Sequence, residues 1–157
     1  MSVEVLNETE TAIDVAEFAQ LGRFVLDSLN VHPQAELVIS FVEVPTMTDL
    51  HVRFLDEPGP TDVMSFPMDE LRPGWAGDPA EAGILGDVVI CPEVAAVQAA
   101  EFGHSLVDEM LVLATHGILH LLGFDHAEPD ERDAMFALQR KLVLAFLATS
   151  STRGLKL

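Results

Sequence analysis

The stretch His116-Gly-Ile-Leu-His120-Leu-Leu-Gly123-Phe-Asp-His126 decides how this chain is built, and it lies within an apolar run from Met110 to Phe124. The run is long enough for a buried helix, on which residues four apart differ by only about 40° in direction. His116 and His120 are therefore expected to point the same way. A continued helix would turn His126 roughly 120° away from His120. Gly123 is expected to take the left-handed conformation and turn the chain back, so that three imidazoles converge.

Three neutral imidazoles with a fourth position open to water are typical of a catalytic site for a borderline-soft divalent cation, most often zinc. The spacing predicts that His116, His120 and His126 bind one Zn²⁺ per chain. It is similar to the metzincin peptidase pattern His-Glu-x-x-His-x-x-Gly-x-x-His. This chain has Gly117 where that pattern carries its general-base glutamate. A peptidase mechanism that uses this base is therefore not expected.

The composition favours one cytoplasmic domain, over residues 1–150, followed by a short C-terminal tail at 151–157. The sequence has 157 residues, a single cysteine, and a formal net charge of −18. We find no signal-peptide pattern at its start and no run of the ~18 apolar residues that a membrane span requires. So negative a protein repels polyanions at long range. Any role on nucleic acid must then rest on a local site or on a partner that delivers the substrate.

The hydrophobic periodicity and the glycine and proline positions predict the order β-α-β-α-β-β-α-α-α. The predicted strands are residues 2–6, 37–44 and 84–91, together with one that lies between the turns at the two ends of the segment 59–67. The predicted helices are 11–30, 45–55, 92–102, a metal-site helix capped by Ser105, and one that starts at Pro129. Residues 149–157 are expected to fray. This order implies a small mixed sheet packed on helices, an α/β (α+β) fold.

Two further blocks accompany the histidine motif. Arg53 precedes Thr61-Asp62-Val63-Met64-Ser65-Phe66-Pro67, and Leu85-Gly86-Asp87-Val88 follows. Together these residues resemble the YbeY family of bacterial metal-dependent endoribonucleases, which mature ribosomal RNA. The resemblance implies a single-domain fold with a four-stranded sheet, and a single-strand-specific hydrolase of phosphodiester bonds. It also implies zinc on the three histidines and action in small-subunit (16S) ribosomal RNA 3′-end maturation and ribosome quality control. The implied partners are the small ribosomal subunit, a small-subunit ribosomal protein and a ribosome-assembly GTPase.

The resemblance makes Arg53 the required cation, whose guanidinium fork suits two phosphate oxygens. The general base stays open: water activated by the metal, the RNA 2′-hydroxyl, or a carboxylate from Asp62 or Asp87. Asp87 and Asp125 either orient the histidines or are strand-edge and turn residues. Ser65 either contacts phosphate or satisfies the backbone.

Two other classes of function share the three-histidine site. One is a metal-dependent hydrolase of another substrate class, such as a peptidase, against which Gly117 counts. The other is a non-enzymatic ribosome-assembly factor, in which zinc only stabilises the fold. Loss of function in a folded Arg53→Ala variant would favour catalysis over the second.

Overall fold

A four-stranded mixed sheet forms the centre of the protein, as predicted. The computed structural model describes residues 2–78 and 82–149. The strands are β1 (Ser2–Asn7), β2 (Glu36–Phe41), β3 (Val63–Pro67) and β4 (Ile84–Ile90). Their order in the sheet is β1-β2-β4-β3. β1, β2 and β4 are parallel, whereas β3 runs antiparallel to β4 and forms one edge.

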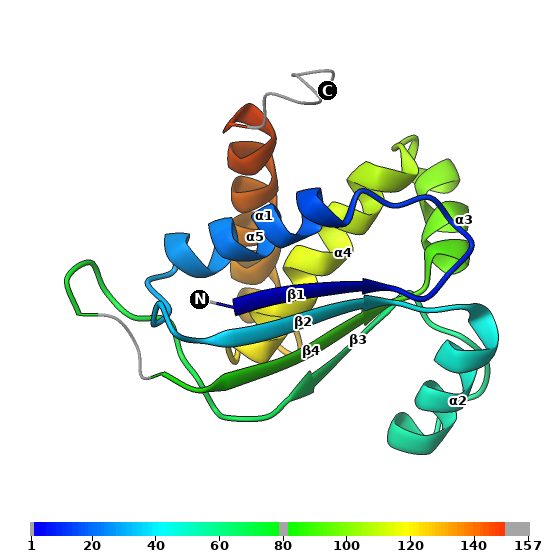
Figure 1. The fold of residues 1–157 in the computed structure, drawn as a ribbon, viewed down its shortest axis with the longest axis horizontal. Helices are drawn as coiled ribbons and strands as arrows, with labels where there is room; N and C mark the ends of the chain where they lie inside the picture. The colour runs from blue at the N-terminus through cyan, green and yellow to red at the C-terminus, as the bar shows by residue number, and fades with distance from the viewer. Residues whose placement is uncertain (1, 79–81, 150–157) are drawn as a thin grey trace.

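Five helices surround the sheet among the described residues. They are α1 (Val15–Ser28), α2 (Val44–Leu55), α3 (Pro92–Phe102), α4 (Leu106–Leu121) and α5 (Pro129–Thr149). Helices α1, α4 and α5 lie on one side of the sheet, and α2 projects on the other (Figure 1). The element order matches the predicted one. Within the described ranges, no helix has the length and apolarity needed to cross a membrane.

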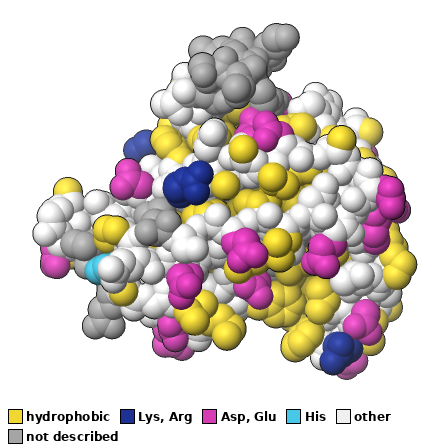
Figure 2. All heavy atoms as spheres, in the orientation of Figure 1, with side chains coloured by type: hydrophobic (Ala, Val, Ile, Leu, Met, Phe, Trp, Pro, Cys, Tyr) yellow, Lys and Arg dark blue, Asp and Glu magenta, His cyan; other side chains and the backbone are white. Residues whose placement is uncertain are grey.

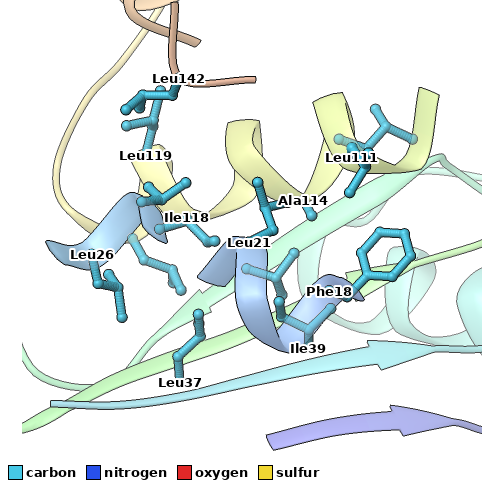
Figure 3. Packing of buried hydrophobic residues seen from close by; sticks show 14 of the residues in the cluster. Phe18, Leu21, Leu26, Leu37, Ile39, Leu111, Ala114, Ile118, Leu119 and Leu142 are labelled. Carbon is cyan, nitrogen blue, oxygen red and sulfur yellow. The ribbon is translucent and has the colours of Figure 1, made fainter. Parts of the chain in front are cut away.

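The main core lies between α4, α1 and the sheet. Leu111, Ile118 and Leu119 of α4 are fully buried, as are Leu21 of α1 and Ile39 of β2. Leu21 lies between α4 and Ile39 of β2, whereas Leu119 lies on the side of α4 toward Leu142 (Figure 3). Burying one such side chain stabilises the fold by about 1.5–3 kcal/mol. Because helix α4 is covered on several sides, its sequence is apolar nearly all round.

Three predicted boundaries are wrong in instructive ways. Helix α1 begins at Val15 rather than at residue 11, because the Asp14 carboxylate accepts a hydrogen bond from the N–H of Ala16 and so caps the helix. The apolar run at residues 37–44 is not one strand, since β2 ends at Phe41 and α2 begins at Val44. The apolar composition of residues 37–44 reflects burial, and it does not by itself indicate a single strand. Of the predicted tail, residue 149 is the last residue of α5. Residues 150–157 lie outside the described part of the chain.

Candidate metal centre

Helix α4 and the turn after it bring the three predicted histidines together. His116 and His120 lie one turn apart near the end of the helix, with ring centroids 4.7 Å apart. The His126 ring lies 5.4 Å from His116 and 4.9 Å from His120. One ligand nitrogen from each ring lies within 4.8 Å of the other two. The three side chains thus form a cluster that can hold a single ion.

Gly123 makes the return of the chain possible. Its φ is +95°, in the region that side chains disfavour. The Arg72 guanidinium also packs against it, so that a Cβ on residue 123 would meet Arg72 Nη1 at 2.4 Å. The exposed Arg72 side chain can move aside, so it is the backbone conformation that requires glycine at the position from which His126 turns back.

Gln139 of α5 contacts the histidine cluster, and the sequence did not reveal this contact. Its Oε1 lies 2.9 Å from His116 Nδ1. An amide oxygen only accepts hydrogen bonds, so the contact fits the His116 tautomer that carries its proton on Nδ1. In that tautomer Nε2 is free to bind a metal. In the sequence, Gln139 is only a polar residue next to the apolar face that contains Met135 and Leu142. Such a residue is ordinary at the border of an amphipathic helix, so it did not indicate a contact with a histidine.

The environment of His116 and His120 favours their neutral, metal-binding form. Burial lowers the pKa of His116, although the Gln139 hydrogen bond and the charge of Asp62 oppose this. Burial also lowers the pKa of His120, and the neighbouring rings of His116 and His126 add to the effect. A set of three imidazole nitrogens suits a borderline-soft divalent cation such as zinc.

The histidines line a cleft of about 910 Å³ between α4, the edge strand β3 and the end of α2. Residues 61–67 form one wall, and Phe54 and Leu55 of α2 extend it. Gln139 and two apolar residues of α4 complete the opposite wall. Among the described residues that line this cleft, Asp62 has the only carboxylate, and none is lysine or arginine. A chain with a net charge of −18 thus has few charged side chains in the lining of this cleft.

Two of the residues predicted to support the site lie in the cleft. Asp62 Oδ1 accepts hydrogen bonds from the N–H of Val63 at 2.8 Å and from the hydroxyl of Thr61 at 3.2 Å. Ser65 Oγ donates to the carbonyl oxygen of Gly117 at 3.0 Å, which ties β3 to α4. Both side chains therefore border the histidines and also have structural hydrogen bonds.

The other three do not line the cleft. Arg53 is exposed on α2, where its Nη1 lies 3.3 Å from Asp49 Oδ2, and it directly precedes Phe54 of the cleft wall. Asp87 is exposed on β4. Asp125 Oδ1 accepts from the backbone N–H of His126 at 2.7 Å, and its charge partly opposes the lowered pKa of His120.

Gly117 lies at the closest approach of α4 to the sheet. A Cβ at this position would meet Val88 Cγ1 of β4 at 2.6 Å and Ser65 Oγ at 3.2 Å. The position faces the strands and is fully packed. A glutamate here, as in the metzincin pattern, would have no room for its side chain.

Comparison with known proteins identifies the family of this chain and agrees with its fold. The profile of a family described as "Endoribonuclease YbeY" matches residues 4–147. A protein of that name from Beutenbergia cavernae is 68% identical over 148 residues, which cover 94% of this chain and 99% of the relative. One from Kineococcus radiotolerans is 59% identical over 158 residues, covering 98% of this chain and 91% of the relative. The solution structure of a Thermotoga maritima protein is 23% identical, with a TM-score of 0.65, covering 93% of this chain and 89% of the other, and it supports the fold alone. This chain belongs to the YbeY family.

Proposed function

We propose that this protein is a single-strand-specific, zinc-dependent endoribonuclease that matures the 3′ end of small-subunit (16S) ribosomal RNA and serves ribosome quality control. Membership of the YbeY family makes it an endoribonuclease, a hydrolase that acts on RNA. The observation that carries the metal dependence is the cluster of three histidine nitrogens within 4.8 Å of one another, at the floor of an open cleft.

Zinc bound at such a site supplies a Lewis acid for a phosphate oxygen and lowers the pKa of water. The chain itself holds and orients the site. With its proton on Nδ1, His116 would donate to Gln139 and would have Nε2 free as the metal ligand.

Arg53 is the residue we assign to the phosphate. Its side chain is 65% exposed and paired with Asp49, itself 61% exposed. Exposed ion pairs contribute only about 0–1 kcal/mol, so that the guanidinium can leave Asp49 at little cost. Its fork of donors can then bind two phosphate oxygens and offset the charge that develops during cleavage.

Of the bases considered, the position of Asp62 in the cleft favours it over Asp87, which is exposed on β4. One Asp62 oxygen already accepts hydrogen bonds from the Val63 N–H and from Thr61. Its second oxygen remains available to take a proton. The RNA 2′-hydroxyl stays an alternative nucleophile, and the product ends distinguish the two routes.

The acidity of the surface supports delivery of the substrate by the ribosome. Acidic side chains are spread over the face in Figure 2, and basic ones are few. We infer that the small ribosomal subunit, with a small-subunit ribosomal protein or a ribosome-assembly GTPase, presents the RNA in the cytoplasm. Cleavage should then be faster on assembled small subunits than on naked RNA, and equal rates would contradict this delivery.

The test of the proposed function combines metal analysis with cleavage of an RNA that carries the 3′ end of small-subunit ribosomal RNA. We expect about one zinc per wild-type chain. His120→Ala should lose metal and cleavage, and Arg53→Ala should lose cleavage but keep metal. Arg132→Ala is the matched control, since Arg132 pairs with Asp133 on the exposed surface of α5. Cleavage that persists in both site variants would reject the proposal and favour a zinc-stabilised, non-enzymatic assembly factor.

A further inference from the structure

Phe54 is an exposed aromatic ring in the wall of the histidine cleft. It lies near the end of α2, and 58% of its surface is accessible to solvent. The cleft that it lines also contains the three histidines. Leu55 beside it is equally exposed, at 58%. Water therefore contacts an apolar surface that continues directly into the candidate metal centre.

Its neighbours hold this ring in one orientation. The ring of Phe66, on β3, meets it edge to face, with centroids 5.2 Å apart and planes at 76°. The Arg53 guanidinium carbon lies 5.9 Å from the Phe54 centroid, within reach of a cation–π contact. An exposed ring that is oriented in advance loses little freedom when a flat ligand stacks on it.

We propose that Phe54 stacks on a nucleobase of an unpaired ribonucleotide next to the bond that is cut. The proposal rests on the endoribonuclease function above and names how its substrate is recognised. Proteins bind single-stranded RNA by stacking splayed bases on aromatic side chains, which bases inside a duplex cannot offer. Arg53 and Phe54 are adjacent, so that one turn of α2 would contact a phosphate and a base of the same strand.

The charge of the cleft makes a base a better ligand here than a run of phosphates. Asp62 has the only carboxylate among the described lining residues, and no lysine or arginine accompanies it. Arg53, just outside the lining, is the one side-chain cation that we assign to a phosphate, and the lining itself attracts the rest of the backbone only weakly. Stacking on Phe54 then provides the affinity that this lining lacks, and it selects unpaired RNA.

The test compares Phe54→Ala, Phe54→Trp and Phe102→Ala in zinc-loaded protein. Phe102 is the matched control, because its ring is 64% exposed and lies outside the cleft. With an unpaired oligoribonucleotide, Phe54→Ala should raise KM about tenfold, equivalent to about 1.4 kcal/mol, with kcat nearly unchanged. Phe54→Trp should restore KM, and Phe102→Ala should not change it.

An RNA with one abasic residue beside the cut site provides the second arm. Removing that base should weaken binding to the wild type about tenfold, yet should cost Phe54→Ala almost nothing further. Binding is followed by fluorescence anisotropy of a labelled short oligoadenylate, independently of cleavage. If cleavage depends on the histidines but Phe54→Ala binds the RNA as tightly as the wild type does, the proposed stacking is rejected. The proposed nuclease function is then still supported. If Phe54→Ala weakens binding but no histidine-dependent cleavage occurs, the proposed nuclease function is rejected. Base stacking on Phe54 is then supported, but its place beside a cut bond is not.

Discussion

Gly117→Ala should destabilise the protein, although the same change in an isolated helix would stabilise it. The new methyl would lie 2.6 Å from Val88 Cγ1 and 3.1 Å from Val88 Cγ2. A comfortable carbon–carbon contact is about 3.5–4.0 Å, so α4 must move from β4 by roughly 1 Å. Overpacking of this kind costs about 1–3 kcal/mol. The higher helix propensity of alanine offsets about 1 kcal/mol of this cost. The free energy of unfolding should therefore fall by about 1 kcal/mol.

The effect on RNA cleavage should be much larger than the effect on stability. His116 lies next to residue 117 and His120 lies one turn further on, so both move with the helix. Displacing a catalytic group by about 1 Å can reduce the rate about 100-fold. Urea unfolding measures the stability, and kcat/KM for RNA cleavage measures the site.

A double variant tests the proposed cause. Val88→Ala removes both methyls that the new side chain would meet, and alone it should cost about 2 kcal/mol for the lost burial and the cavity. In Gly117→Ala/Val88→Ala the loss should be smaller than the sum of the two single losses by about 1 kcal/mol. Strict additivity, or a Gly117→Ala protein that is both more stable and fully active, would refute the close approach of α4 to β4.

Three further outcomes follow from the site. Gln139→Ala should weaken zinc binding about 10–100-fold, measured by competition with a chelator, while Gln98→Ala on α3 should leave it unchanged. Because burial lowers the pKa of His116 and His120 below 6.5, these ligands stay neutral as pH falls through 6.5 and protonate only below it. The half-point of metal loss on acid dialysis should therefore lie below pH 6.5, and a half-point above that value would contradict the burial. Burial raises the pKa of Glu109 above 4.5, so its protonated form stabilises the fold and this contribution is lost as pH rises through the raised pKa. Glu109→Gln should therefore raise Tm at pH 7, and this gain should disappear below pH 4.5. An unchanged or lower Tm at pH 7 would show that the ionised carboxylate does not destabilise the fold.

The parts of the site that the sequence predicted are those set by local geometry. His116 and His120 share a helix face because they are four residues apart, and Gly123 turns His126 back because of its own φ. The alternation of side chains between the two faces of β3 could also be predicted from the sequence. Val63 packs against the main core, whereas Met64 and Phe66 pack on the other side of the sheet.

The parts that it could not predict depend on packing between distant segments. Gln139 reaches His116 only because α5 lies against α4, and 23 residues separate the two. The orientation of Phe54 depends on Phe66, which belongs to a different element. Family resemblance selected Arg53, but only the structure gives its pairing with Asp49 and its place beside Phe54. No periodicity in a single sequence encodes such contacts.

The compactness of the histidine motif has a consequence for folding thermodynamics. His116 and His126 are the ends of a segment of only eleven residues, whereas the opposite wall of the cleft comes from residues 54–67. An unfolded chain keeps the three imidazoles within a short tether and so retains part of the affinity for zinc. A ligand stabilises a fold only by the difference between its affinities for the folded and unfolded chains. Zinc should therefore raise the free energy of unfolding by less than its affinity for the folded protein suggests, and a nascent chain can acquire its metal before the sheet has closed around it.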